Sequence, residues 1–406
     1  MWNIIKKYYR SNRIELLITF CIFSNLYPYN IPTFVYYIGL ALLAFKMSQN
    51  KVRFESKYAI YVVFLAVVWL SSIVNMAVDL RLILFTAILV MCGPFITSLR
   101  WHLFKKKLMY NFVIGFAATV IISLIAKVKG VNNQLVRFGG ESMMQYGGVD
   151  EFSGYAKFPM WNSAAAAMSV ILFAYLLFRN KGKNAKYQYI FLFMLLASIY
   201  VCLLSASRSA FGLAVLASGL LFYWLSFNVK AIIKYAVIFG VIGVLSLPFF
   251  MKSATRMMMK QEAQESTGMT SRDFLWNRRM AEFDSSPIFG VGYAVNGVGA
   301  DRRIGRDESG GSWIAILAQT GVIGFVIALI LWLRTFTPVK KVKYDPEYVL
   351  AYAIFCFFTV HTILEGYMFQ GGWYMCVICW TCVGLLSEAQ MYRKQLIALK
   401  QQGHEL

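Results

Sequence analysis

Residues 58–77 read YAIYVVFLAVVWLSSIVNMA and contain no charged side chain. Residues 187–204 and 235–250 are equally free of charge. An uncharged run of about 20 residues matches the hydrocarbon thickness of a bilayer, where the backbone must satisfy its own hydrogen bonds and therefore forms a helix. Of the 406 residues, 59% are hydrophobic and only 15% are charged. The sequence therefore predicts an all-α polytopic membrane protein.

The apolar runs predict about twelve transmembrane helices in a single integral membrane domain over residues 1–406. The expected spans are 14–29, 31–45, 58–78, 80–99, 108–126, 160–178, 187–204, 209–227, 231–250, 312–333, 348–364 and 370–387. The first apolar segment lacks a small-residue cleavage pattern, so we interpret it as a signal anchor rather than a cleavable signal peptide.

The net charge of +21 is explained by membrane topology rather than by a nucleic-acid partner. Basic clusters precede the first span and occupy alternate connections: Lys6, Lys7, Arg10 and Arg13; Lys46, Lys51, Arg53 and Lys57; Arg100 with Lys105, Lys106 and Lys107; Arg179 with Lys181, Lys183 and Lys186; Arg334 with Lys340, Lys341 and Lys343. The positive-inside rule places these connections and both termini in the cytoplasm.

The seven cysteines all fall inside expected spans: Cys21, Cys92, Cys202, Cys356, Cys376, Cys379 and Cys382. The last three form a C-x2-C-x2-C run that superficially resembles a metal motif. On a helix they follow one face, among apolar neighbours and without acidic or histidine partners. Zinc binds thiolates, which hydrocarbon disfavours. We therefore expect these cysteines to pack helices, and we expect neither a metal nor disulfides.

Two connections are long, and both are external in this topology: residues 127–159 and residues 251–311. The first contains Arg137, whose neighbours are apolar, and two Gly-Gly pairs that follow it. Long ordered loops are uncommon unless they are functional. The membrane helices are therefore interpreted as a scaffold, and the external face as the part that carries the active site.

The larger external loop is expected to contain helices of its own. Residues 254–266 are rich in Met, Lys, Gln and Glu and predict a short helix. Thr270 or Ser271 can cap a second helix that runs to about Asp284, where a Ser-Ser-Pro sequence ends it.

One face of that second helix carries Arg272, Trp276, Arg279 and Phe283. A rise of 1.5 Å per residue separates Arg272 and Arg279 by roughly 10 Å along the axis. This face can present two guanidinium groups to a polyanion, with an aromatic ring between them. The alternative is a membrane-surface helix whose arginines meet lipid phosphates.

Other polar residues lie at the expected outer membrane edge. Arg208, flanked by small Ser and Ala residues, is either an anion ligand or an interfacial arginine. His361 is either a proton carrier or a hydrogen-bonding residue between helices, and Glu365 lies nearby at the end of the same span. Asp307 and Glu308 precede the tenth span and are either functional or solvated loop acids.

Several motifs in register resemble the O-antigen ligase and O-antigen polymerase superfamily. They are Phe158-Pro159-Met160-Trp161-Asn162, Ser207-Arg208-Ser209-Ala210-Phe211, Arg272-x3-Trp276, SPIFGVG at residues 286–292, and SWIAILAQTGVIG at residues 312–324. The resemblance covers residues 155–390. The first five spans are supported by topology alone.

The resemblance implies a metal-independent, cofactor-free glycosyltransferase with a GT-C-like fold that uses undecaprenyl-diphosphate-linked sugars. Arg208 and Arg272 match the two arginines that are thought to hold the diphosphate, and Asn162 matches a characteristic Asn. Ligases of this family typically have a His about where Gly310 stands here. Its absence favours a polymerase and leaves Asp307 and Glu308 as candidate replacements.

In the implied reaction, an acceptor hydroxyl attacks the anomeric carbon of the donor glycan, and undecaprenyl diphosphate leaves. Arg208, Arg272 and Arg279 would stabilise the leaving diphosphate. Glu308 is the expected base, and in-line attack inverts the anomeric configuration. The side chains of Trp276, Tyr293 and Trp313 either stack on sugar rings or pack against other side chains of the protein. The remaining residues expected to bind substrate are Arg137, Asn162, Asp307, His361 and Glu365.

The favoured function is thus a polysaccharide polymerase of lipopolysaccharide or capsule biosynthesis in the bacterial cytoplasmic (inner) membrane. Its site would face the periplasm or cell exterior. Its expected partners are lipid-linked oligosaccharide, membrane lipid and a chain-length regulator. One alternative is a ligase that transfers a finished glycan to lipid A core or to a protein. An alternative from another class is a twelve-span transporter or flippase, although no internal repeat supports it.

Overall fold

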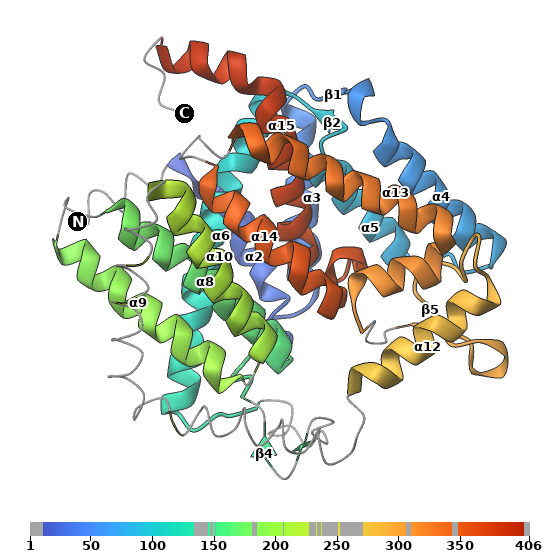
Figure 1. Ribbon diagram of the computed structural model, residues 1–406, viewed down its shortest axis with the longest axis horizontal. Coiled ribbons are helices and arrows are strands. Elements are labelled where there is room, and N and C mark those ends of the chain that lie inside the picture. Colours follow the sequence, from blue (N-terminus) through green and yellow to red (C-terminus); the bar gives the residue numbers. More distant parts are fainter. Residues whose placement is uncertain are drawn as a thin grey trace.

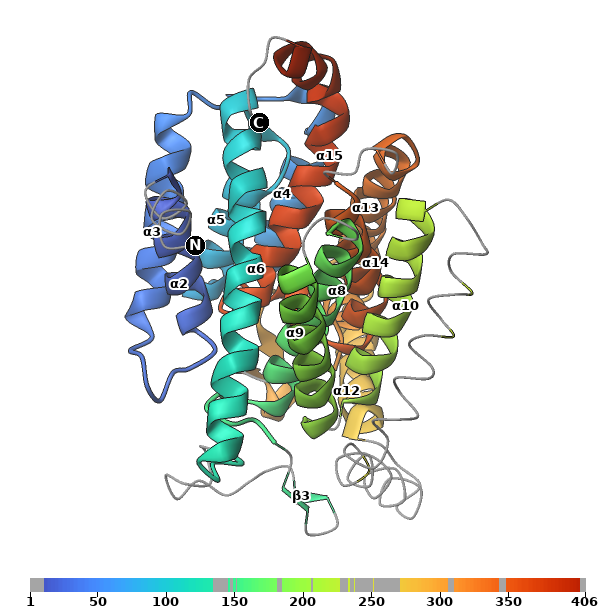
Figure 2. The ribbon, with the colours of Figure 1, turned by 90° about the vertical axis from the view of Figure 1, so that its left-hand side faces the viewer.

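A computed structural model describes residues 11–133, 145–146, 149–150, 152–180, 185–205, 207–226, 233, 237, 251, 271–305, 310–342 and 348–401. Its α-helices are α2 (Arg13–Ser24), α3 (Phe34–Gln49), α4 (Ile60–Val74), α5 (Leu80–Cys92), α6 (Leu99–Val128), α8 (Pro159–Arg179), α9 (Ala185–Leu204), α10 (Arg208–Ser226), α12 (Ser271–Ser285), α13 (Ser312–Val342), α14 (Val349–Leu364) and α15 (Tyr374–Gln401). Figure 1 shows their order, and Figure 2 shows most of them running side by side as a bundle.

Short elements join the helices. The 3-10 turns are η1 (Ser56–Tyr58), η2 (Gly299–Asp301) and η3 (Gly366–Phe369). The strands form three antiparallel two-residue pairs, namely β1 (Arg53–Phe54) with β2 (Ile96–Thr97), β3 (Gln145–Tyr146) with β4 (Val149–Asp150), and β5 (Val295–Asn296) with β6 (Arg303–Ile304).

The helices are those of a polytopic membrane protein. Among the described residues, six are long and apolar enough to cross a membrane, namely α6, α8, α9, α10, α13 and α15. Four shorter apolar helices, α3, α4, α5 and α14, have 10–17 residues each. The total of twelve spans remains a prediction. The expected ninth span (231–250) and the expected helix at 254–266 lie almost wholly outside the described residues.

The centre of the bundle is formed by α15 and α8. In their most apolar windows, 89% of α15 and 78% of α8 is buried inside the protein. In α8 the run from Ser163 to Ala167 consists of Ser and Ala alone. Small side chains let neighbouring membrane helices approach closely, and α8 accordingly packs against α6, α9 and α10.

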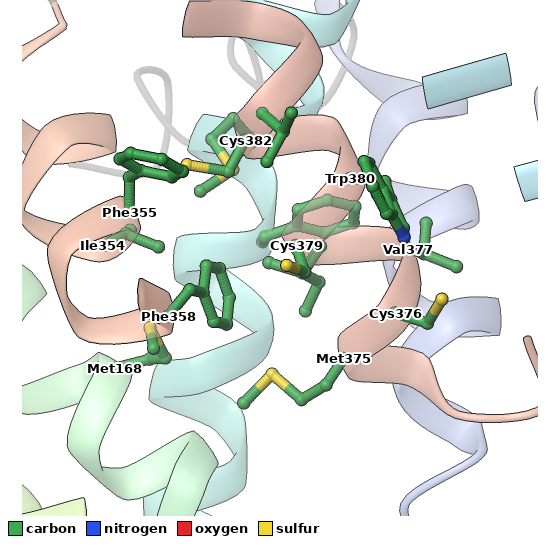
Figure 3. Packing of buried hydrophobic residues seen from close by; sticks show 14 of the residues in the cluster. Met168, Ile354, Phe355, Phe358, Met375, Cys376, Val377, Cys379, Trp380 and Cys382 are labelled. Carbon is green, nitrogen blue, oxygen red and sulfur yellow. The ribbon is translucent and has the colours of Figure 1, made fainter. Parts of the chain in front are cut away.

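The C-x2-C-x2-C run lies within this core. Cys376, Cys379 and Cys382 are buried on α15 in one hydrophobic cluster with Met168 of α8 and with Phe355 and Phe358 of α14; Cys379 and Cys382 face α14, and Cys376 lies on the other side of α15 (Figure 3). The packing role predicted from the sequence is therefore confirmed for these three side chains.

The two ends of the bundle differ. We call the end that carries the 25–33 turn, the 152–158 segment, α12 and the 365–373 turn the loop end. We call the opposite end, with the β1–β2 strand pair and the end of α15, the basic end. In Figure 2 the loop end is at the bottom and the basic end is at the top.

At the basic end the structure differs from the expected spans. The expected fourth span (80–99) is shorter in the structure, because α5 ends at Cys92. The expected fifth span (108–126) begins earlier, because α6 starts at Leu99, where the Ser98 hydroxyl accepts from the Trp101 N–H at 3.2 Å. Lys105 and Lys106 are therefore not in a cytoplasmic loop as expected but are buried within α6.

The reason for this burial is a partner far along the chain. Lys105 Nζ contacts Glu388 of α15, whose other carboxylate oxygen is 3.1 Å from His102 Nδ1. His102 Nε2 lies 2.8 Å from the Tyr348 hydroxyl, and Lys106 Nζ lies over the Tyr348 ring. A buried cation with a carboxylate partner is tolerated where an unpaired one is not.

The helix α13 covers the expected tenth span but is broken within it. Gly321 has φ 65° and ψ −170°, which is not helical. This region of backbone conformation is essentially restricted to glycine. The segments Ser312–Thr320 and Val322–Val342 therefore meet at a kink near the loop end.

Candidate functional site

A cavity of about 260 Å³ lies at the loop end, where segments from most of the chain meet. Its wall is contributed by residues 25–33 after α2, Arg81 of α5, residues 157–161 at the start of α8, Arg279 of α12, residues 293–305 around the β5–β6 hairpin, Gln319 of α13 and residues 365–373 before α15. Concave sites with a few convergent polar groups are where ligands bind in most proteins.

The kink in α13 is held by the 286–292 loop. The N–H groups of Val291 and Gly292 donate to the carbonyls of Ala318 and Gln319, at 3.0 and 3.1 Å. These carbonyls are free to accept because the helix is interrupted at Gly321. The pairing fixes Gln319 in the cavity wall, and it explains why the sequence has a glycine-rich motif in both segments.

Two glycines permit this pairing sterically. A Cβ on Gly321 would lie 2.2 Å from the Ile288 carbonyl oxygen, and one on Gly290 would lie 2.3 Å from the Gln319 carbonyl carbon. Both glycines also have positive φ. Backbone meets backbone here, so no side-chain movement can relieve the overlap. The motif glycines are thus required by the fold of the site.

Arg279 connects α12 to the β5–β6 hairpin. Its Nη1 donates to Glu282 at 2.6 Å and to the Val295 carbonyl at 3.1 Å, and its Nη2 donates to Asn296 Oδ1 at 2.5 Å. Glu282 also accepts from the Gly297 N–H at 2.6 Å. Arg279 lines the cavity, as the expected substrate-binding role requires, but both terminal nitrogens already have protein acceptors. In this geometry its guanidinium positions the hairpin.

The aromatic wall of the cavity comes from α8 and the 365–373 turn. The rings of Trp161 and Trp373 are stacked, with centroids 4.8 Å apart and planes inclined by 25°. Lys157 Nζ lies 5.0 Å from the Phe158 ring centroid and 5.8 Å from that of Trp161. Trp161 lies in the motif at residues 158–162, and Trp373 follows the Gly371-Gly372 pair. The sequence did not indicate a role for either tryptophan.

Tyr293 supports the turn that carries Trp373. It is buried and stacks on Phe85 at 5.6 Å, and its hydroxyl accepts from the Gly371 N–H at 3.3 Å. Burial raises the pKa of the Tyr293 phenol well above its ordinary value, against a smaller lowering by the Gly371 hydrogen bond. The phenol is therefore neutral at physiological pH. Tyr293 lines the cavity, but its ring faces are covered by protein.

The charged groups of the cavity wall are Arg81, Lys157, Arg279 and Glu365. Arg81 Nε is 3.6 Å from Asp79. Glu365 is only 5% exposed, and its backbone carbonyl accepts from the Ser312 hydroxyl at 2.7 Å. The sequence indicated Arg279 and Glu365. It missed Arg81 and Lys157, because isolated basic residues at helix starts carry no distinguishing pattern.

Asn162 lies in a buried hydrogen-bond chain rather than in the cavity wall. Its Oδ1 accepts from the Ser123 hydroxyl at 2.9 Å, and its Nδ2 donates to the Ser205 hydroxyl at 3.3 Å. It thereby joins α6 and α8 to the connection between α9 and α10. Arg208 begins α10 just after this connection and is exposed. The geometry supports a positioning role for Asn162.

Trp276, Trp313 and His361 make contacts within the protein. Trp276 Nε1 donates to the Gly310 carbonyl at 2.8 Å, and Trp313 Nε1 donates to Thr362 at 3.1 Å. His361 is buried, with Nδ1 3.1 Å from the Tyr367 hydroxyl. These geometries favour the packing and hydrogen-bonding alternatives for all three residues.

Gly310 occupies a position that a side chain cannot enter. It has a φ of 70°, and a Cβ there would lie 2.9 Å from Leu275 Cβ and from Trp276 Cδ1. The packing of α12 thus leaves little room for a side chain at Gly310, near which the family resemblance predicts a His in a ligase.

Four expected site residues lie partly or wholly outside the described part of the chain. Arg137, Asp307 and Glu308 are not among the described residues, and Arg272 is described only by its place in the first turn of α12. Their roles remain predictions. Within the described residues, no group of three or more His, Cys, Asp and Glu side chains is arranged to hold a metal ion.

Comparison with known families agrees with the motifs. Residues 192–329 match the family model described as O-antigen ligase. The match extends from α9 through α10 and α12 into α13, so it contains both Arg208 and Arg272 as well as the two interlocked glycine motifs. It confirms the resemblance to the O-antigen ligase and polymerase superfamily. No curated protein matches the chain.

Proposed function

We propose, from the family match over residues 192–329, that this membrane protein is a polysaccharide polymerase. It transfers a growing glycan from undecaprenyl diphosphate to a hydroxyl of another lipid-linked repeat unit. The transfer is metal-independent and inverts the anomeric configuration. The loop end faces the periplasm or cell exterior, and the basic end faces the cytoplasm.

The observation that carries this proposal is the composition of the cavity at the loop end. It combines cationic side chains, one carboxylate and a wall of stacked indoles. A lipid-linked oligosaccharide has the matching chemistry, since its diphosphate is anionic and its sugars have both apolar faces and hydroxyl groups. The cavity also lies beside α12, the helix that begins next to Arg272.

Each of the proposed site residues has its own role in the reaction. Arg208 and Arg272 bind the diphosphate of the donor and stabilise the charge that develops when it leaves. The planar guanidinium suits phosphate oxygens and remains charged at any physiological pH, so it can replace a divalent ion in this role. Glu308 removes the proton from the attacking hydroxyl. Asn162 and Arg279 hold the elements that surround the site.

The closed position at Gly310 favours a polymerase over a ligase. A histidine at that position would collide with Leu275 and Trp276, so the residue typical of ligases has no room here. A transporter is disfavoured because its binding site would lie near the bilayer midplane. The cavity lies instead among the turns at the loop end.

The test uses purified full-length protein and the lipid-linked repeat units that accumulate in cells lacking its gene. We expect a ladder of products by gel electrophoresis, with the same yield in EDTA. A single transfer to lipid A core without a ladder would indicate a ligase. Transfer that stops in EDTA and returns with Mg²⁺ would contradict the metal-independent mechanism.

A further inference from the structure

We propose that Trp161 and Trp373 form a sugar-binding subsite, which holds one pyranose ring of the repeat unit through an indole wall and the Trp373 N–H. The proposal rests on the proposed function for the identity of the glycan. It concerns the oligosaccharide rather than the diphosphate, and it assigns a specificity role to two residues outside the matched family region.

The first observation is an unsatisfied donor. Trp373 is 5% exposed, and its Nε1 is buried without a hydrogen-bond partner among the described residues. An indole nitrogen can only donate. Buried donors are almost always paired, and one left unpaired is costly. Trp373 lies in the cavity wall, so a small rotation of its indole toward the cavity would let a ligand hydroxyl supply the missing acceptor.

Other tryptophans in the bundle show the contrast. Trp332 and Trp380 are as buried as Trp373, yet their Nε1 atoms donate to Thr359 and to the Met368 carbonyl at 3.1 and 2.8 Å. Neither lines the cavity. Among the described residues, the buried indole that lacks an acceptor is therefore the one at the cavity, as expected for a group that binds a ligand.

The second observation is the shape and chemistry of the wall. Phe158, Trp161 and Trp373 place adjoining aromatic surfaces on one side of the cavity. A pyranose ring has an apolar face of C–H groups and a polar edge of hydroxyl groups. An aromatic surface with a polar donor at its edge satisfies both parts of such a ring. Lys157 adds a cation beside this surface.

The third observation is that the subsite is rigidly held. The Tyr374 hydroxyl donates to the Trp161 carbonyl at 2.9 Å, and its backbone N–H donates to Asn25 Oδ1 at 3.1 Å. The Tyr36 hydroxyl donates to the Gly371 carbonyl at 2.9 Å. These bonds fix the backbone that carries the two tryptophans before a ligand arrives, which lowers the entropy lost on binding.

The experiment compares two probes by isothermal titration calorimetry with full-length protein in nanodiscs. One probe is the oligosaccharide released from the lipid-linked repeat unit by mild acid, and the other is undecaprenyl diphosphate. For Trp373→Phe we expect about tenfold weaker oligosaccharide binding, because the variant loses one hydrogen bond from a desolvated donor and such a bond changes the affinity by about this factor. Binding of undecaprenyl diphosphate stays within about twofold.

The matched control is Trp332→Phe, which makes the same chemical change at a paired indole and should alter neither affinity. Gly372→Leu provides a second variant that does not touch the indoles. Apart from its two chain neighbours, a Cβ on this cavity-lining glycine would meet no atom within 4 Å, so the leucine variant should fold with its side chain in open space. It should also weaken oligosaccharide binding.

Unchanged oligosaccharide affinity in both Trp373→Phe and Gly372→Leu would overturn the subsite, as would a wild-type protein that binds no oligosaccharide. An equal loss for both probes would also overturn it, because the cavity would then be a diphosphate site. If the variants behave as expected but wild-type protein forms no ladder, the subsite stands and the polymerase function fails.

Discussion

Arg279 donates to acceptors on both α12 and the β5–β6 hairpin, and these contacts define what its side chain can do. A guanidinium that already has two carboxylate or amide partners and a carbonyl has little capacity left for a diphosphate. Arg208, in contrast, is exposed at the start of α10. At the scale of single residues, Arg279 thus holds the shape of the site, and the proposed binding of the diphosphate is assigned to Arg208 and Arg272.

The prediction at this scale concerns Arg208 and Arg272. Replacing either by Lys keeps one positive charge but loses the planar fork that donates two hydrogen bonds to phosphate. Loss of one preorganised donor typically lowers the rate by about 10²–10³. We expect Arg208→Lys and Arg272→Lys to lower the polymerisation rate by this factor without changing the thermal stability of the protein.

Arg278→Lys is the control for this prediction. Arg278 has a 21% exposed side chain with Nε 3.7 Å from Glu282, and Lys preserves the charge of such a pair. The buried Glu282 is held more closely by Arg279 and the Gly297 N–H, both at 2.6 Å, so the Arg278→Lys protein should keep close to wild-type activity. If Arg278→Lys is as damaging as Arg272→Lys, α12 is a nonspecific basic surface and the assignment of the arginines is wrong.

At the scale of elements, the decisive feature is the interruption of α13 by the 286–292 loop. The sequence predicted a helix over residues 312–333, because its apolar residues fit a span. It could not predict the break at Gly321, since glycine is common within membrane helices. The break depends on donors from Val291 and Gly292, which only the folded chain brings to it.

Gly321→Ala is predicted to disrupt this junction. The alanine would adopt a backbone conformation that only glycine tolerates, and its Cβ would lie 2.2 Å from the Ile288 carbonyl oxygen. Strain of this kind costs about 1–3 kcal/mol before the steric overlap is added. We expect a lower melting temperature by differential scanning fluorimetry and loss of activity.

Gly219→Ala is the matched control, because Gly219 lies within α10 and a Cβ there would meet no atom within 4 Å. Alanine favours a helix over glycine by up to about 1 kcal/mol, so this variant should be as stable as wild type or slightly more stable. If Gly321→Ala matches it in melting temperature, the kink is not needed for the fold.

At the scale of the whole molecule, the buried charges of the basic end connect α6 to α15. The sequence placed Lys105 in a cytoplasmic loop, because a cluster of lysines between apolar runs normally marks one. Its partner Glu388 is 283 residues away, a separation at which no local pattern can indicate a contact. The positive-inside rule assigns a side of the membrane to a cluster of lysines, but it cannot predict the environment of each lysine.

Lys105→Met is predicted to destabilise the bundle. It leaves Glu388 buried without its cation, and breaking a buried ion pair typically costs about 3–5 kcal/mol. The melting temperature should fall clearly. The double variant with Glu388→Leu should recover part of the loss, and Lys107→Met, at an exposed position in the same cluster, should have no effect. Equal melting temperatures for Lys105→Met and Lys107→Met would contradict a structural role for the pair.

The orientation of the molecule is a separate prediction. The basic connections place residues 251–311 outside and both termini inside. A cysteine introduced at Ser266 should react in intact cells with an impermeant thiol reagent, whereas one at Gly403 should react only after lysis. The wild-type protein is the background control, because its cysteines are buried except for Cys356, which is half-buried. Reaction at Gly403 in intact cells would reverse the arrangement.

The sequence predicted the site only in part, because the cavity is a product of the whole fold. Arg279, Tyr293 and Glu365 could be indicated, since each lies in a motif or at a span end. Arg81 and Lys157 could not, because their significance comes from the segments that surround them. The stacking of Trp161 on Trp373 likewise joins α8 to the turn before α15, two segments that are distant in the chain.

The wall of the cavity also has a consequence for synthesis of the protein. Asn25 Nδ2 donates to the Gly372 carbonyl at 3.3 Å, and 347 positions separate the two residues. At about 5–20 residues per second, translation takes on the order of tens of seconds to cover that distance. During this time the early helices already reside in the bilayer while the cavity still lacks its 365–373 side. The cavity therefore closes only when residues 365–373 have been made, late in the synthesis of the chain.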